Sequence, residues 1–87
     1  MKTFKDLKVG DKIYYIHRRD RTVGVFEISN VNVSSCGILF TVHTVIGVNN
    51  DCVEVVSVDA CKIPLSNNYT IYSSEELFLK DLQDENI

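Results

Sequence analysis

Residues 3–16 read TFKDLKVGDKIYYI, and this stretch predicts how the rest of the chain folds. Thr3 and Asp6 have the spacing of a capping box, in which two side chains bond the backbone at the start of a helical turn. The sequence therefore predicts one turn of helix over residues 4–8. A strand follows from Lys12, and we expect the later strands to pack against it.

The composition predicts a single β-rich domain over residues 1–87. Hydrophobic residues make up 45% of the chain and charged residues 24%, values typical of a folded protein. Twelve valines and eight isoleucines favour strands, because β-branched side chains fit a pleated surface. The net charge of −3 divides unevenly: residues 1–21 carry seven Lys/Arg and three acids (+4), and residues 22–87 carry two and nine (−7). Such a division can mark a face that meets anionic partners.

Alternating apolar residues predict five strands separated by turns. The first is apolar on both faces, which is typical of a central strand or of one that bends between two layers. The second changes phase in its middle, which predicts a bulge near Ser29-Asn30. Pro64 predicts a loop, because proline cannot donate to a central ladder. The expected strands are residues 12–17, 22–33, 38–45, 52–58 and 69–72, and Ile13, Phe40 and Val55 should share one interior.

The end of the chain has the pattern of a short amphipathic helix. Ser73 is placed to cap it, with Glu76 completing a capping box. Phe78 and Leu82 form an apolar stripe one turn apart. We expect residues 83–87 to fray.

The fourth expected strand, residues 52–58, changes phase as the second does. Short strands joined by tight turns, with two such changes of phase, are typical of a small barrel or of two packed sheets. The stretch Val9-Gly10-Asp11-Lys12-Ile13-Tyr14 resembles the entry into the first strand of SH3-like small barrels, including the KOW type. The glycines that a KOW module places later in its first hairpin are missing here. A looser likeness is to small bacterial and phage proteins without a known activity, which end in a strand and a Ser-capped helix. An oligonucleotide-binding barrel normally has its helix between the third and fourth strands, whereas the helix expected here is C-terminal. This position, together with the resemblance, favours a five-stranded SH3-like small barrel with a short N-terminal helical turn and a C-terminal helix.

A basic segment between the first two strands is the first candidate site. Arginine suits phosphate contacts, and an outward tyrosine can stack on a base. Asp20 within the segment and the acidic remainder of the chain argue against this interpretation, and a charged hairpin tip is the simpler alternative. The residues predicted to bind nucleic acid are Lys12, Tyr14, Arg18, Arg19 and Arg21.

Metal and catalytic sites have weaker patterns. Cys36, His43, Cys52 and Cys61 are ligand types that zinc prefers, but the chain has no Cys-x-x-Cys pair. Cys36 and His43 are too far apart along an extended strand to act as a nucleophile and its base, even if Asp59 oriented the imidazole. We therefore expect no metal, no cofactor and no enzymatic activity.

The remaining class is a protein that binds other proteins. The chain has no Trp, which argues against the aromatic groove that holds proline-rich peptides. An unpaired strand edge or the C-terminal helix could instead accept a partner or a second copy, and Leu39, Val45 and Leu79 are candidates for an exposed apolar patch. Three cysteines without an export signal or a long apolar run indicate a cytoplasmic protein that does not enter a membrane. The sequence favours a non-enzymatic interaction module, with nucleic-acid binding as the alternative.

Overall fold

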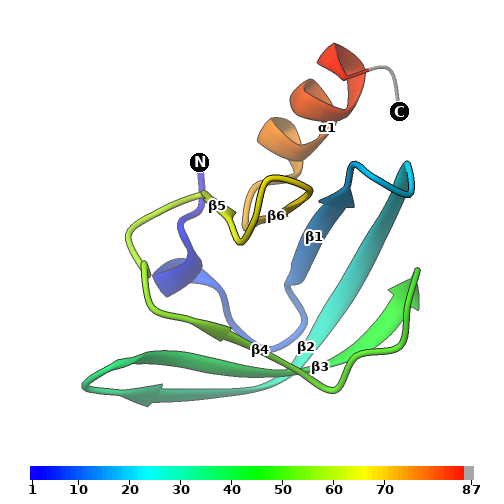
Figure 1. Ribbon diagram of the computed structural model, residues 1–87. Helices are drawn as coiled ribbons and strands as arrows, with labels where there is room; N and C mark the ends of the chain where they lie inside the picture. Colours follow the sequence, from blue (N-terminus) through cyan, green and yellow to red (C-terminus); the bar gives the residue numbers. More distant parts are fainter. Residues whose placement is uncertain (86–87) are drawn as a thin grey trace.

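The computed structural model describes residues 1–85, which form one mainly β structure with a single α-helix (Figure 1). All six strands belong to one antiparallel sheet, in the order β4-β3-β2-β1-β6-β5. The mainly β prediction is confirmed, whereas the prediction of five strands is wrong by one. In chain order the elements are η1 (Phe4–Asp6, a 3-10 turn), β1 (Lys12–His17), β2 (Thr22–Ser34), β3 (Gly37–Ile46), β4 (Cys52–Val55), β5 (Lys62–Pro64), β6 (Tyr69–Tyr72) and α1 (Glu75–Asp84).

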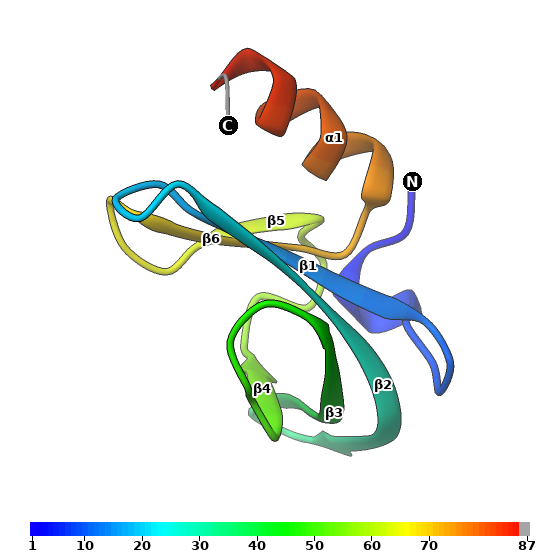
Figure 2. The ribbon, with the colours of Figure 1, turned by 90° about the vertical axis from the view of Figure 1, so that its right-hand side faces the viewer.

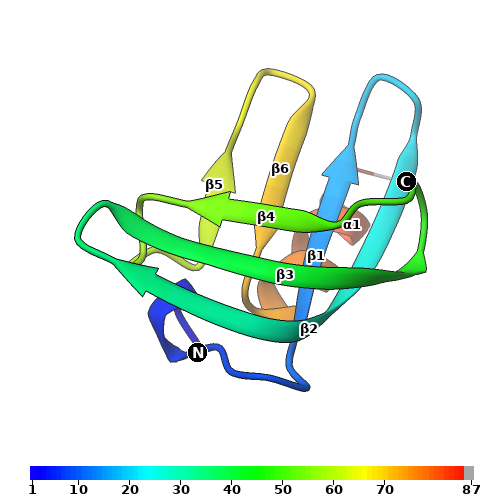
Figure 3. The ribbon, with the colours of Figure 1, turned by 90° about the horizontal axis from the view of Figure 1, so that it is seen from below.

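The sheet curls because β2 takes part in both of its halves. Its first half pairs with β1, and residues 25–34 pair with β3. The register with β3 shifts twice, between Val25 and Phe26 and between Ile28 and Asn30. Such irregularities bend a strand and increase its twist, and Figures 2 and 3 show β3 and β4 running across β1, β6 and β5. The predicted bulge near Ser29 is confirmed, and the first shift was not predicted.

The main core lies inside this curl, between the two halves of the sheet. The prediction that Ile13, Phe40 and Val55 share one interior is confirmed, since their exposed fractions are 0%, 0% and 1%. The turn η1 adds Phe4 and Leu7 to the same cluster. The core therefore joins both halves of the sheet to the N-terminal turn.

The first strand is central, which is one of the two arrangements that its two apolar faces predicted. Ile13 and Tyr15 face the main core, while Ile16 packs with Tyr72 of β6 and Phe78 of α1 on the other face. Figure 2 shows α1 on one side of β1 and β6, with β3 and β4 on the other. The helix thus covers a face of the sheet that the curl leaves outside.

Two predicted elements are shorter in the structure, and both end where the N-terminal turn meets the chain after β4. The Thr3–Asp6 cap is present, with the Asp6 carboxylate accepting from the Thr3 backbone N–H and hydroxyl, but the turn ends at Asp6. The strand predicted to reach Val58 ends at Val55. Its continuation leaves the ladder, and the carbonyl of Val58 accepts a bond from the Lys5 N–H instead.

The prediction of a loop at Pro64 is wrong, because the proline lies in an edge strand. Ser73 N–H donates to the Cys61 carbonyl and Leu65 N–H donates to the Tyr69 carbonyl. Because hydrogen-bonded pairs alternate along an antiparallel ladder, the backbone groups of Lys62 and Pro64 face away from β6. The N–H that proline lacks is therefore one that the ladder does not use.

The start and end of α1 also differ from the prediction. The N-cap is Ser74, whose Oγ accepts from the Leu77 N–H at 3.4 Å. Ser73 is not the cap, because its N–H continues the β6 ladder and its Oγ donates to the Lys2 carbonyl at 2.6 Å. The helix continues to Asp84, and Glu85 is its C-cap. The expectation of fraying stays a prediction for residues 83–85 and, for residues 86–87, lies outside the described residues.

Three acidic side chains fasten α1 to the sheet. Glu75 accepts a hydrogen bond of 2.9 Å from the Tyr14 hydroxyl, and burial together with this bond raises the pKa of Tyr14 to about 12. Glu85 accepts from the Arg18 guanidinium. Asp81 accepts from the Tyr72 hydroxyl at 2.8 Å and from Lys62 at 2.5 Å. Burial alone would raise the pKa of Asp81, but the bonds from these two donors lower it.

We expect the Asp81→Asn variant to lose about 1–2 kcal/mol of unfolding free energy at pH 7, because charged hydrogen bonds contribute on that scale. The pKa of Asp81 is lower in the folded than in the unfolded state, so its contribution is complete above the ordinary carboxyl pKa and disappears as the pH falls through the folded value. The difference between the wild type and the variant should therefore be complete above about pH 4 and shrink as the pH falls further below that value. Urea unfolding at several pH values measures it. Asp84→Asn, on the exposed side of the helix, is the control, and an equal effect of the two substitutions would contradict the assignment.

Candidate functional site

The residues predicted to contact nucleic acid do not form one cluster. Lys12 and Arg18 lie at opposite ends of β1, separated by roughly 20 Å at the usual rise of a strand. Tyr14 stacks on Phe78 with 5.0 Å between ring centroids. Arg18 is bonded to Glu85, which leaves Arg19 and Arg21 as the exposed arginines of the loop.

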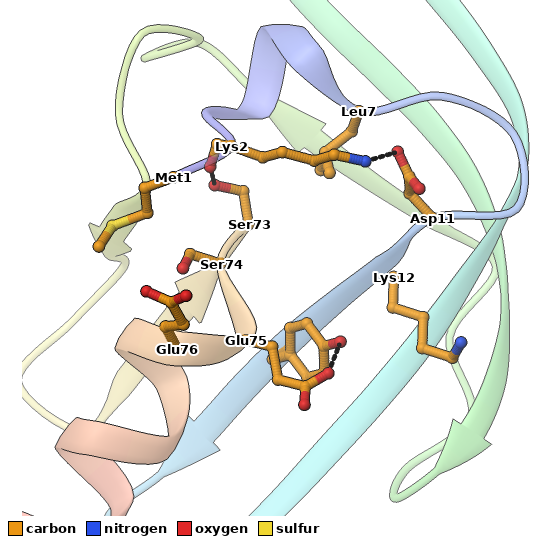
Figure 4. A pocket seen from close by; sticks show the side chains of 10 residues that line it. Met1, Lys2, Leu7, Asp11, Lys12, Ser73, Ser74, Glu75 and Glu76 are labelled. Atoms are coloured by element: carbon orange, nitrogen blue, oxygen red, sulfur yellow. Dashed lines mark hydrogen bonds and ion pairs between the residues drawn. The ribbon is translucent and has the colours of Figure 1, made fainter.

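Lys12 and Tyr14 line a pocket of about 290 Å³ between the N-terminal segment, β1 and the start of α1 (Figure 4). Several of its polar groups bond each other. Lys2 pairs with Asp11 at 3.1 Å, and Tyr14 donates to Glu75. Both lysines and carboxylates line the pocket, so it offers no surface of one charge to a ligand. We interpret it as the junction that holds the chain's N-terminal segment against the helix.

A larger pocket of about 420 Å³ lies between β4 and the β5–β6 hairpin. We call this pocket the edge groove. Its floor is apolar, formed by Phe26, Val53 and Ile71, each of which is at least nine-tenths buried. Its rim is mostly polar and exposed. The residues of the rim are Asn50, Cys52, Glu54, Leu65, Ser66 and Tyr69.

The strand beside the groove has an unpaired backbone edge. Val42 N–H donates to the Asp51 carbonyl at 2.9 Å, which makes these two residues a hydrogen-bonded pair. Since such pairs alternate with non-bonded pairs, Val53 and Val55 bond to β3 and Cys52 does not. The N–H and C=O of Cys52 and of Glu54 therefore point away from the sheet, beside the groove.

The two edges of the sheet differ in how they resist pairing. The outward groups of β5 belong to Lys62 and Pro64, and lysine and proline are residues that proteins use to block edge pairing. Strand β4 has no proline, and both of its outward residues keep their N–H donors. The sheet is thus protected at β5 and open at β4.

Tyr69 forms one wall of the groove and is held by an aromatic stack. Its ring lies parallel to Tyr15, with centroids 5.2 Å apart, and Tyr15 stacks in turn on Phe26 at 5.2 Å. The Tyr15 hydroxyl accepts from the Val48 N–H at 3.1 Å, which ties the β3–β4 turn to the same stack. The apolar part of the groove is therefore fixed before any ligand arrives.

The cysteines and the histidine considered as metal or catalytic residues lie apart from the groove floor. Cys36 is exposed in the β2–β3 turn, and Cys61 precedes β5. His43 faces outward from β3, and its Nε2 lies 3.3 Å from a Glu27 carboxylate oxygen. Within residues 1–85, no group of three or more His, Cys, Asp or Glu side chains is arranged to hold a metal ion. Cys52 reaches the groove only at its rim.

The apolar residues considered as a binding patch are not neighbours. Leu39 and Val45 are exposed on β3, whereas Leu79 is exposed on α1. Figure 2 shows these two elements on opposite sides of β1 and β6. Isolated exposed apolar side chains are ordinary on protein surfaces and indicate no site.

Sequence reasoning anticipated that a strand edge could bind a partner, but it did not identify which one. Pro64 was the available signal, because a proline inside a strand marks an edge, and the sheet's opposite edge is then the one open to pairing.

Comparisons with protein-family models, with curated proteins and with solved structures found no match. None of the helices in residues 1–85 combines the length and the apolar character that crossing a membrane requires.

Proposed function

We propose that this protein is a non-enzymatic interaction module that accepts an extended polypeptide segment as an additional strand along β4. The observation that carries the proposal is the combination of outward backbone groups on Cys52 and Glu54 with the apolar floor of the edge groove beside them. In strand addition, main-chain hydrogen bonds supply affinity and pockets for alternate side chains supply specificity. The edge groove offers both.

The position of the groove favours a single extended segment over a second folded copy. One wall is β4, and the other is formed by Leu65, Ser66 and Tyr69 of the β5–β6 hairpin. An incoming strand that pairs with β4 lies between these walls. A whole sheet pairing edge to edge would bring further strands against the hairpin. An unfolded tail or loop of another protein therefore fits better.

The finer fold assignment belongs to the same proposal. Strands β4, β3, β2 and β1 are sequential antiparallel neighbours, and β6 returns to the free side of β1. This order supports an SH3-like barrel in which β5 is an added edge strand and the gap between β4 and β5 is left open. Three free thiols support a cytoplasmic location, where they stay reduced.

Replacing Cys52 tests the strand addition, because proline at this position removes the outward N–H that would bond to the added strand. We expect the Cys52→Pro variant to keep the β3–β4 ladder, since proline is tolerated as the first residue of a strand, and to lose peptide binding. Cys52→Ala keeps the N–H and should bind as the wild type does. The probe is acetyl-Ser-Thr-Val-Lys-Val-Thr-Ser-amide, and the measurement is the peptide-induced NMR shift of Val53 and Tyr69.

Methylated peptides make the same test without altering the protein. With lysine opposite Glu54, the lysine N–H points toward β4, and the N–H of each neighbouring valine points away. N-methylation of the lysine should abolish binding, and N-methylation of a valine should leave it. Equal effects of the two methyl groups, or peptide-induced shifts confined to residues outside the groove, would overturn the proposal.

Nucleic-acid binding by the β1–β2 loop is the alternative. Its support is that Arg19 and Arg21 are exposed and that Arg21 has a φ of 54°, a left-handed conformation that glycine or asparagine adopts more easily. Against it stand the Arg18–Glu85 pair and the distance to Lys12. Titration with a generic oligonucleotide at low salt separates the two functions, because strand addition predicts no shifts in the loop.

A further inference from the structure

The alternation of β4 determines which side of a bound strand each of its residues faces. Val53 and Val55 are buried and point into the curl, while Cys52 and Glu54 are exposed on the outer face. Residues directly opposite each other on paired strands lie on the same face. A ligand residue opposite Val53 therefore points into the edge groove, and one opposite Glu54 points outward.

The inward side of the groove accepts an apolar side chain. Val53, Phe26 and Ile71 form its floor, and the ring of Tyr69 forms a wall. Its volume of about 420 Å³ lies within the range of ordinary ligand pockets. Burial of an apolar side chain against this floor removes apolar surface of both molecules from water.

The outward side is acidic. Among the residues that line the groove in the described part of the chain, Glu54 is the one with a charged side chain. Asp51 lies just before β4, on an exposed turn. Neither carboxylate has an ion-pair partner in residues 1–85. A cation placed opposite Glu54 would find an unpaired carboxylate on the same face of the sheet.

Building on the proposed function, we infer that the segment bound along β4 carries a basic residue between two apolar residues. The lysine or arginine lies opposite Glu54 on the outer face, and one of the apolar side chains enters the edge groove. Opposite charges across neighbouring strands are favourable, and like charges are unfavourable.

A set of three peptides tests this inference. They are acetyl-Ser-Thr-Val-Lys-Val-Thr-Ser-amide and the versions with glutamine or glutamate in place of lysine. We expect the lysine peptide to bind the wild type about two- to fivefold more tightly than the glutamine peptide, as cross-strand charge pairs predict, and the glutamate peptide to bind most weakly. The difference should shrink as salt is raised, because the pair is exposed.

Charge reversal on the protein completes the test. Glu54→Lys should reverse the order of the three peptides, whereas Asp84→Lys, an equal change of charge on the exposed side of α1, should leave the order unchanged. If all three peptides bind the wild type equally, strand addition stands and the inferred charge preference is wrong. If none of them binds, the proposed function itself is overturned.

Discussion

The Phe40→Ala variant is expected to unfold with a free energy lower by about 3–5 kcal/mol, the usual result of removing a buried phenylalanine ring. Phe40 is fully buried in the middle of β3, between Val31 of β2 and Val53 of β4. Its ring belongs to the cluster that joins the two halves of the sheet. The loss is a large part of the stability that a small domain possesses, which is about 5–15 kcal/mol.

Denaturant unfolding measures this change, with Thr41→Ala as the control. Thr41 is the next residue of the same strand, but it faces outward and is exposed. We expect the control to change stability by no more than about 0.5 kcal/mol, as surface substitutions usually do. Equal effects of the two variants would mean that the inside of the curl is not the main core.

The second large effect is expected from Gly24→Ala, because Gly24 is covered by the ring of Tyr15. A Cβ at this position would lie 1.7 Å from Cε1 of Tyr15. The ring cannot move aside easily, since it is 1% exposed and stacks between Phe26 and Tyr69. Overpacking of a filled core costs about 1–3 kcal/mol and occasionally more, and we expect the upper end of this range.

A double-mutant cycle gives this prediction its sharpest form. In a Tyr15→Leu background the ring is gone, so the added methyl group of Gly24→Ala should be tolerated much better. Residues in contact show such non-additive effects, whereas separated residues show additive ones. Additive losses measured by thermal or denaturant unfolding would contradict the packing of Tyr15 on Gly24.

The elements that could be predicted from sequence are those that local pattern alone determines. The two apolar faces of β1 indicated a central strand or one that bends between two layers, and the phase change in β2 indicated the bulge at Ser29. The predictions that failed depended on neighbours in space. Pro64 is in a strand because that strand is an edge. Ser73 does not cap α1 because its backbone continues the β6 ladder to Cys61 and its Oγ bonds to the Lys2 carbonyl.

The candidate site was harder to predict for the same reason. The basic charge of its segment made Arg18 a candidate for binding nucleic acid. Its guanidinium instead bonds to Glu85, a residue 67 positions away, and no local sequence pattern predicts this contact. The openness of β4 depends on the order of the strands in the sheet, which the sequence does not state. Once this order is known, the alternation along β4 shows that the backbone groups of Cys52 and Glu54 point outward and that those of Val53 bond to β3.

Amide hydrogen exchange along β4 tests the central claim most directly. In the free protein, the N–H groups of Cys52 and Glu54 should exchange rapidly, and those of Val53 and Val55 should be protected by their bonds to β3. Adding the lysine peptide should slow the exchange of Cys52 and Glu54. Protection of all four amides in the free protein, or unchanged exchange of Cys52 and Glu54 at saturating peptide, would contradict an open edge that accepts a strand.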